Sequence, residues 1–157
     1  MGLGTGLNAC LSLQYILDKK MELYYHACEA FPVEIQQMNH LRDVSFLNDL
    51  MNAPWNIDVN NHPQLTLHKS LLTFEKLLLK NNFYHLVYWD AFSPEKQPEL
   101  WSEETFQKIF LAMKADAILC TYCAKGAVKR TLKAVGFCVE TLQGPPGKRE
   151  MIRARKR

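Results

Sequence analysis

The chain has 157 residues, enough to bury one hydrophobic core, so its length favours a single domain over residues 1–157. Hydrophobic residues make up 48% and charged residues 22%, which is ordinary for a globular protein, and no apolar run is long enough for a transmembrane helix. The N-terminus does not match a secretory signal, so we expect a cytoplasmic protein whose five cysteines are reduced.

The net charge of +3 is unevenly distributed along the chain. Residues 125–157 contain ten Lys/Arg and two Asp/Glu, a net charge of +8, which leaves −5 on residues 1–124. A basic C-terminal fifth favours contact with a polyanion such as nucleic acid. A solvated tail, ending in RARKR, explains the same charge equally well.

The chain opens with the glycine-rich stretch MGLGTGLN, followed by apolar residues at the spacing of a helix. Glycines at positions 2, 4 and 6 allow a sharp turn and a close approach of the backbone to a ligand. From Gly4 the stretch fits the dinucleotide pattern G-x-G-x-x-G/A, and from Gly2 it fits G-x-G-x-G, which is typical of S-adenosylmethionine (SAM) sites. Such a loop normally follows a buried strand, but only Met1 precedes this one.

The next segments predict alternating strands and helices. Residues 22–28 form a predicted strand, and Glu29 at its end is the expected acidic partner for ribose hydroxyls under either pattern. An irregular helix follows, with Ile35 and Leu47 among the apolar residues on one side. PWNIDVNNHPQ is expected to be a loop, QLTLH a strand and SLLTFEKLLLK a helix, and YHLVYWD has the pattern of a buried strand ending at Asp90.

The C-terminal half continues this alternation. ELWSEETFQKIFLAMK predicts a helix with acidic first turns, AILCTYC a buried strand, and AVKRTLKAVGF a short amphipathic helix that stops at Gly136. CVETLQGPPGKREMIRA predicts two strands joined by a Gly-Pro-Pro-Gly turn. We therefore expect an α/β fold: a mostly parallel sheet with helices on both faces and a C-terminal antiparallel strand pair.

Several segments together resemble the methyltransferase domain of the MnmC-type tRNA-modifying enzymes: GLGTGLN, residues 26–32, WDAFSPEKQPELW, TYCAKGAVKRTLKAVGF and GPPGKREM. The resemblance covers nearly the whole chain and implies a Rossmann-like class I methyltransferase fold that uses SAM. The implied reaction is methylation of the 5-aminomethyl group of (2-thio)uridine at the wobble position of tRNA, giving the 5-methylaminomethyl product. The SAM site implied by the resemblance is lined by Gly2, Gly4, Thr5, Gly6, Asn8 and Glu29.

The chain departs from this family in three places. Members have a strand before the glycine loop, so we expect a domain that lacks its first strand. Residues 68–70, HKS, stand where relatives tend to carry an acidic residue near the adenine, and residues 115–117, ADA, replace a glycine pair.

Methyl transfer to an amine requires aligned reactants, a free lone pair on the amine and exclusion of water. Asp90, at the end of a predicted buried strand, is the candidate catalytic residue that hydrogen-bonds or deprotonates the amine. A helix or turn cap in DAFSP is the structural alternative. Phe92 and Pro94 are expected to wall the pocket and stack on the uracil ring, whereas Lys96 and Trp101 are interpreted as loop and packing residues.

Basic residues near the C-terminus are candidates for phosphate contacts that position a tRNA. The substrate-binding candidates among them are Lys125, Lys148 and Arg149, while Lys129 and Lys133 fit a solvated helix face. Cys120 and Cys123 match C-x-x-C, but they lie on a predicted strand and no second pair exists, so we predict no metal site.

Other functions stay open from the residues, of which a dinucleotide-dependent oxidoreductase is the weakest, since no segment resembles a substrate domain. A spermidine-synthase-like aminopropyltransferase shares the fold, although the basic C-terminus argues against a cationic substrate. A non-catalytic or degenerate RNA-binding fragment is favoured by the missing strand. The resembling family often carries a flavin-dependent oxidoreductase domain, and since no segment here encodes one, we expect that activity from a separate protein of the same pathway.

Overall fold

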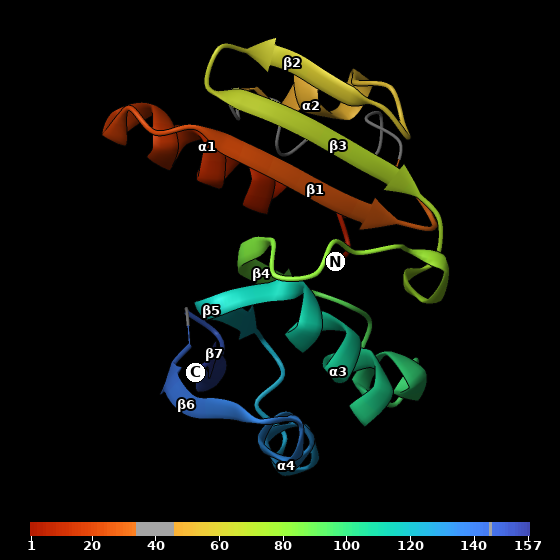
Figure 1. Cartoon of the computed structure of the whole chain (residues 1–157), viewed down its shortest axis with the longest axis vertical. Coiled ribbons are helices and arrows are strands. Elements are labelled where there is room, and N and C mark those ends of the chain that lie inside the picture. Colours follow the sequence, from red (N-terminus) through yellow and green to blue (C-terminus); the bar gives the residue numbers. More distant parts are fainter. Residues whose placement is uncertain (34–45, 145) are drawn as a thin grey trace. The chain divides into compact units, whose positions relative to one another are not determined.

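The computed structural model describes residues 1–33, 46–144 and 146–157, which form two compact units, unit 1 (Met1–Leu77) and unit 2 (Leu78–Arg157). Figure 1 labels their helices and strands. The predicted irregular helix that includes Ile35 lies largely outside the described residues. No helix in the described ranges is both long and apolar enough to cross a membrane. The assignment of residues 1–157 to one methyltransferase domain stays a prediction.

Unit 1 contains a three-stranded sheet in the order β1-β3-β2, in which β1 and β3 are parallel and β2 is antiparallel to β3. The helix α1 begins directly after the glycines, as predicted, and the strand β1 confirms the strand predicted at residues 22–28 with a shift of one residue. The elements of unit 1 are α1 (Leu7–Lys19), β1 (Leu23–Glu29), α2 (Leu47–Asn52), β2 (Asp58–His62), β3 (Leu65–Leu71) and the 3-10 turn η3 (Phe74–Lys76).

One face of the unit 1 sheet is apolar and packs against both described helices of the unit. Side chains alternate along β3, so that Leu65 and Leu67 point to this face. They belong to a single buried cluster with residues of β1, of α1, and of α2 and its C-cap: Ala9, Leu13, Ile16, Ala27, Leu50 and Ala53. The packing of this face fixes α1, and with it the glycine loop, against the sheet.

Lys69 lies on the same apolar face and is fully buried. Its Nζ donates hydrogen bonds of 2.9 Å to the carbonyls of Leu50 and Met51, near the end of α2, and lies 4.5 Å from the centre of the Trp55 ring. Burial lowers the pKa of Lys69. The lysine therefore satisfies helix-end carbonyls that would otherwise be buried without donors.

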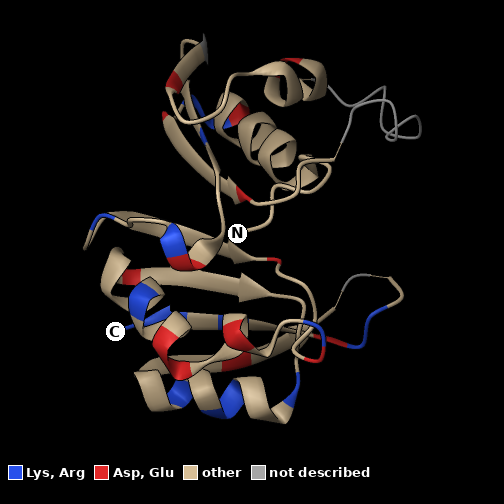
Figure 2. Cartoon of the chain, turned by 90° about the vertical axis from the view of Figure 1, so that its right-hand side faces the viewer, with Lys and Arg blue, Asp and Glu red and all other residues tan. Residues whose placement is uncertain are grey.

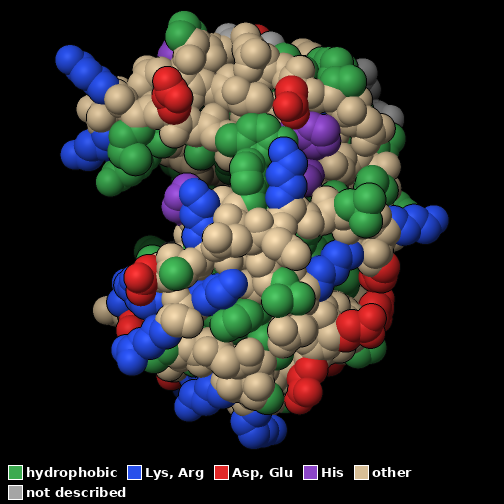
Figure 3. Space-filling model, in the orientation of Figure 1, with side chains coloured by type: hydrophobic (Ala, Val, Ile, Leu, Met, Phe, Trp, Pro, Cys, Tyr) green, Lys and Arg blue, Asp and Glu red, His purple; other side chains and the backbone are tan. Residues whose placement is uncertain are grey.

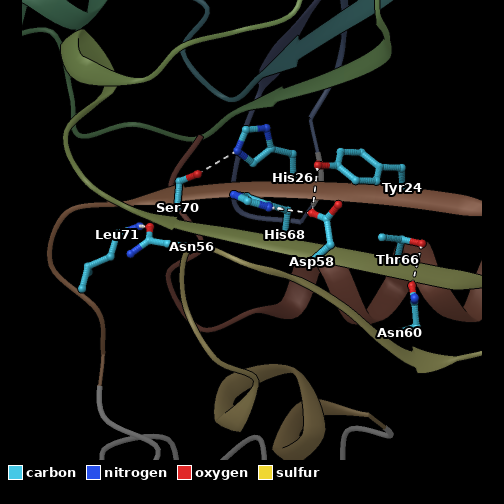
Figure 4. A network of polar contacts seen from close by, with 9 residues as sticks. All are labelled: Tyr24, His26, Asn56, Asp58, Asn60, Thr66, His68, Ser70 and Leu71. Carbon is cyan, nitrogen blue, oxygen red and sulfur yellow. Dashed lines mark hydrogen bonds and ion pairs between the residues drawn. The ribbon is translucent and has the colours of Figure 1, made fainter.

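The opposite face of the sheet carries a polar network (Figure 4). His26 Nε2 lies 2.9 Å from Ser70 Oγ, and His68 Nδ1 lies 2.7 Å from Asp58 Oδ1. The Tyr24 hydroxyl donates to the same Asp58 oxygen at 3.3 Å, and the rings of His26 and His68 meet edge to face with centres 4.9 Å apart. These contacts tie all three strands together through their side chains.

Two predictions for unit 1 are wrong. The expected loop PWNIDVNNHPQ contains β2, an edge strand that is held by side-chain contacts such as the 2.9 Å bond from Thr66 Oγ1 to Asn60 Oδ1. The expected helix SLLTFEKLLLK begins as the end of β3, because this strand continues beside β1 until Leu71 pairs with Glu29. It then forms only η3, anchored by the buried side chains of Phe74 and Leu77.

Unit 2 contains a four-stranded sheet in the order β4-β5-β7-β6. The predicted antiparallel C-terminal pair is confirmed, with β7 lying between β5 and β6 and antiparallel to both. The elements of unit 2 are β4 (Tyr84–Trp89), the 3-10 turn η4 (Pro98–Trp101), α3 (Glu103–Ala112), β5 (Met113–Thr121), α4 (Gly126–Val135), β6 (Phe137–Gln143) and β7 (Glu150–Lys156).

The sheets are mixed, which corrects the prediction of a mostly parallel sheet. Among the described residues, β1–β3 and β4–β5 are parallel, whereas β2–β3, β5–β7 and β6–β7 are antiparallel. The prediction missed β2 altogether, and it did not include the antiparallel pairing of β7 with β5. The expectation of helices on both faces of one sheet stays a prediction.

The helix α3 passes into β5 without an intervening residue. Ser102 accepts a hydrogen bond from the backbone N–H of Thr105 at 3.2 Å and so caps the start of the helix. The helix was expected to continue to Lys114, but it ends at Ala112 and β5 begins at Met113. Lys156 of β7 donates to the carbonyls of Phe110 and Met113, both at 2.7 Å, and so holds both sides of this junction.

Candidate functional site

The glycine loop adopts a backbone conformation that favours glycine at each of its three glycine positions. The φ angles of Gly2, Gly4 and Gly6 are 78°, 52° and 76°, in the left-handed region that is costly for residues with a Cβ atom. The N–H of Gly2 donates to the carbonyl of Cys28 at 3.0 Å, which ties the start of the chain to β1. The spacing of the glycines at every second position thus reflects three separate residues with a left-handed backbone conformation.

Gly4 and Gly6 differ in the space around them. A Cβ atom on Gly4 would meet no heavy atom within 4 Å, so a ligand can approach the backbone there. A Cβ atom on Gly6 would lie 2.6 Å from Leu50 Cδ2 and 3.3 Å from Leu47 Cδ1, both in α2. The missing side chain of Gly6 therefore allows α2 to pack against the loop, while that of Gly4 leaves open space.

Glu29 joins the glycine loop to the end of β1. Its Oε2 accepts a hydrogen bond from the Gly4 N–H at 3.2 Å, and its Oε1 accepts one from the Phe31 N–H at 3.0 Å. Thr5, in the glycine loop, and Asn8, in the first turn of α1, are half-buried. No side chain caps α1 by a hydrogen bond, and its first turn carries no acidic residue.

These groups fit SAM. A carboxylate at the end of β1 accepts hydrogen bonds from ribose hydroxyls, and uncapped N–H groups at a helix start suit the carboxylate of an amino acid. The open space at Gly4 lets such a ligand lie against the backbone. All six residues predicted to line the cofactor site lie in unit 1.

The loop after β4, here called the β4 loop (residues 90–95), carries the predicted catalytic residue. Asp90 is exposed, and its side chain makes no hydrogen bond or ion pair within the described part of the chain, so the cap alternative has no contact to support it. Ala91 is buried, and Phe92 is 57% exposed. Pro94 lies half-buried at the far side of the loop. The loop therefore exposes the Asp90 carboxylate and the Phe92 ring on either side of the buried Ala91.

Three side chains from other elements hold this loop. The Tyr122 hydroxyl donates to the carbonyl of Ala91 at 2.9 Å, and the Trp101 Nε1–H donates to the carbonyl of Phe92 at 2.8 Å. Lys125, the N-cap residue of α4, forms an ion pair with Glu95. The sequence interpretation of Trp101 as a packing residue missed its hydrogen bond to the loop.

Tyr122 also contacts a predicted substrate-binding residue. The Nζ of Lys148, in the turn between β6 and β7, lies 4.3 Å from the centre of the Tyr122 ring. Burial, and then the neighbouring Cys123 and Asp90, raise the pKa of Tyr122, so its hydroxyl stays protonated and able to donate at neutral pH. Arg149 next to Lys148 is exposed.

The other residues singled out in the sequence have ordinary surroundings. All five cysteines are free thiols; Cys123 is buried, and burial raises the pKa of Cys120. Within the described ranges, no three His, Cys, Asp or Glu side chains are grouped so that they could hold a metal ion. The one functional candidate not singled out in the sequence is Tyr122, whose only signal was an aromatic residue with a polar tip at the end of a buried strand.

Comparisons with known proteins complete the description. A family model described as "S-adenosyl-L-methionine-dependent methyltransferase" matches residues 56–157. The "tRNA 5-methylaminomethyl-2-thiouridine biosynthesis bifunctional protein MnmC" of Dichelobacter nodosus is 28% identical over 169 residues, covering 98% of this chain and 27% of its own length. The protein of the same name from Campylobacter hominis is 45% identical over 65 residues, 41% of this chain and 10% of its own.

Solved structures give the same result at the level of the fold. The crystal structure of MNMC2 from Aquifex aeolicus matches 98% of this chain and 50% of its own, with a TM-score of 0.81 at 21% identity. The CMeT domain of the citrinin polyketide synthase matches with a TM-score of 0.60 at 11% identity, over 99% of this chain and 45% of its own. The Rossmann-like methyltransferase fold is thereby confirmed. The chain spans about a quarter of the length of the relatives that it matches along its whole length.

Proposed function

Because the chain belongs to the S-adenosyl-L-methionine-dependent methyltransferase family, we propose that it methylates the 5-aminomethyl group of (2-thio)uridine at the wobble position of tRNA. The product would be 5-methylaminomethyl-(2-thio)uridine. Support for this substrate comes from relatives named for 5-methylaminomethyl-2-thiouridine biosynthesis, which align with 98% and 96% of the chain. The observation that carries the SAM-binding part is the carboxylate of Glu29 held at the open backbone of Gly4.

The cofactor-binding residues would be those of the glycine loop and the end of β1. Glu29 would exchange its bonds to backbone N–H groups for bonds to the ribose hydroxyls, and the backbone of Gly2, Gly4 and Gly6 would lie against the ligand. Thr5 and Asn8 would flank it at the uncapped start of α1. When bound, SAM supplies an electrophilic methyl group on a sulfonium sulfur.

The β4 loop would receive the methyl-accepting base. Asp90 accepts a hydrogen bond from the amine and takes its proton, which keeps the nitrogen lone pair free for the reaction. Phe92, exposed beside it, stacks on the uracil ring, and Pro94 walls the pocket. This division of roles follows from the exposed carboxylate and ring on a loop whose backbone is anchored at Ala91.

The tRNA backbone would meet the basic side chains of unit 2. Figure 2 shows Lys and Arg along α4 and around the turn between β6 and β7, and Figure 3 shows such side chains across one face of this unit. Lys125, Lys148 and Arg149 would contact phosphates and fix the position of the tRNA without reading its sequence. The relatives are bifunctional by name, and we propose as partner a flavin-dependent oxidoreductase of the same pathway.

Calorimetric titration of SAM into the chain tests the proposed cofactor binding. The proposed methyl transfer is tested with SAM labelled in its methyl group and a tRNA that carries 5-aminomethyl-2-thiouridine, beside a matched tRNA with unmodified wobble uridine. We expect SAM binding at one site and label on the first tRNA alone. SAM binding with no label on either tRNA would overturn the proposed substrate, and tRNA binding without SAM binding would favour the non-catalytic RNA-binding alternative. Decarboxylated SAM with putrescine serves as the aminopropyltransferase control.

A further inference from the structure

The β4 loop contains little structure of its own that would fix its first half. The Ser93 carbonyl accepts hydrogen bonds from the N–H groups of Lys96 and Gln97, just after the loop, at 2.8 and 3.0 Å, and these bonds organise only the second half of the loop. In the first half, the Ala91 carbonyl instead accepts a hydrogen bond from the side chain of Tyr122, which follows β5. The Phe92 carbonyl accepts one from the side chain of Trp101, the last residue of η4. The direction in which Asp90 and Phe92 point therefore depends on these side chains.

We propose that Tyr122 is a positioning residue, which holds the backbone on the carboxyl side of Asp90 so that its carboxylate meets the methyl-accepting amine. This inference rests on the proposed function. Asp90 and Phe92 are exposed on either side of the buried Ala91, and the Tyr122 hydroxyl binds the carbonyl between them. Without that bond, the peptide between Ala91 and Phe92 can rotate and redirect both side chains.

The two side-chain donors act together because their rings touch. Trp101 is 6% exposed, and its ring meets that of Tyr122 edge to face, with centres 6.2 Å apart and planes at 85°. Trp101 also packs edge to face against Phe106 of α3, with centres 6.2 Å apart. Tyr122 is thus held against a buried side chain that is itself fixed on a helix, as a positioning group requires.

Tyr122 also connects the β4 loop with the turn between β6 and β7. The ammonium group of Lys148 lies over its ring at 4.3 Å, within the range of a cation–π contact. Lys148 is one of the residues proposed to contact a tRNA phosphate. A single side chain therefore contacts both the loop that carries the proposed catalytic residue and a proposed tRNA-binding cation.

The test compares Tyr122→Phe with Tyr15→Phe in the 157-residue chain. Tyr122→Phe removes the donor hydroxyl and leaves the ring to contact Trp101 and Lys148, while Tyr15 is a 60% exposed residue of α1 and serves as the matched control. Hydrogen–deuterium exchange is measured at residues 91–97, and steady-state kinetics are measured on the aminomethylated tRNA. In Tyr122→Phe we expect faster exchange in this segment and a fall in kcat of about tenfold to a hundredfold. The KM for SAM should stay within about twofold of its original value.

Unchanged exchange at residues 91–97, or an unchanged kcat in an active enzyme, would overturn the proposal. Should Tyr122→Phe unfold, Trp101→Phe removes the second donor and should give the same combination of loop exchange and kcat. If the unsubstituted chain methylates no tRNA, the proposed function fails, and the exchange comparison still decides whether Tyr122 holds the loop.

Discussion

The glycine loop before α1 and the β4 loop are held in place by opposite means. The glycine loop, residues 1–6, keeps its shape through backbone conformations that favour glycine and through the carboxylate of Glu29, which accepts a hydrogen bond from the Gly4 N–H. The β4 loop keeps its shape through side-chain donors, from residues 9 and 31 positions away, that bind its carbonyls. The first arrangement is visible in the sequence as a motif, and the second is not.

This difference in how the two loops are held indicates which substitutions should damage each of them. An added methyl group damages the first loop because its turns need positive φ angles. Removal of a single hydroxyl damages the second because a carbonyl is left without its donor while the packing stays intact.

Replacement of Asp90 by Ala should lower methyl transfer by about 10² to 10⁴, since a positioned proton acceptor typically contributes that much. The affinity for SAM, measured by calorimetry, should stay within about tenfold, because the predicted cofactor residues all lie in unit 1. Asp90→Asn is the isosteric control and should be nearly as inactive. Unaltered turnover in Asp90→Ala would remove this residue from the mechanism.

Gly6→Ala and Gly4→Ala should separate packing from ligand access within one loop. Both place a Cβ atom at a positive φ angle, at a cost of about 1–2 kcal/mol in the free energy of unfolding. Gly6→Ala should cost about 1–3 kcal/mol more, because its Cβ meets Leu50 at 2.6 Å. For each variant, the loss of SAM affinity is divided by the loss of stability. This ratio should be larger for Gly4→Ala than for Gly6→Ala. Urea unfolding and calorimetry give both quantities, and equal ratios in the two variants would contradict this division.

Glu29→Gln should weaken SAM binding by about tenfold or more, since hydrogen bonds to a charged group are worth about 1.5–3 kcal/mol. The fold should change little, because the amide oxygen can still accept the bond from Gly4. Calorimetry measures the affinity, and thermal melting checks the fold. An unchanged affinity would mean that Glu29 only holds the shape of the glycine loop and does not bind SAM.

Lys148→Glu combined with Arg149→Glu should weaken tRNA binding. The slope of log K against log salt concentration should also become shallower, by about one for each phosphate that the variant no longer neutralises. Lys133→Glu, on the helix face that fits solvation, is the control and should have a smaller effect. Filter binding at several salt concentrations measures both. An unchanged slope in the double variant would assign these residues to the solvated surface.

The smallest effect concerns an ion pair outside both loops. Arg153 donates to Glu140 Oε2 at 2.6 and 3.0 Å, and these bonds hold the pKa of that carboxyl below its usual range. Such a group stabilises the fold above the pKa of the unfolded chain, and this contribution disappears as the pH falls through the folded pKa. Glu140→Gln should therefore slightly narrow the difference in Tm between about pH 7 and pH 3, with methyl transfer unchanged. A difference in Tm as wide as in the unsubstituted chain would contradict this.

The sequence predicted the positions of the apolar strands well, although only Trp89 of β4 is buried, and it predicted the polar edge poorly. YHLVYWD and AILCTYC are apolar runs, and both coincide with strands of the unit 2 sheet for most of their length. β2 has a polar sequence with low strand propensity, and it forms because β3 and the side chains of Thr66 and His68 bind it. No local pattern contains that information.

The residues of the candidate site also differ in how far the sequence could predict their roles. Glu29 was predictable because it lies at the end of a recognisable strand, and the structure places it on the glycine loop. The role of Tyr122 was not predictable, because its partner is a backbone carbonyl, which leaves no side chain in the sequence to match it with. Contacts to the main chain across the fold are the part of such a site that a pattern of side chains cannot reveal.

The junction between α3 and β5 has a consequence for how this family can change over time. Since no residue separates Ala112 from Met113, and Lys156 binds carbonyls on both sides, an inserted residue here would move one of these carbonyls away from the Lys156 ammonium group. Insertions and deletions among natural variants should therefore avoid this point and collect in connections such as the turn between β6 and β7.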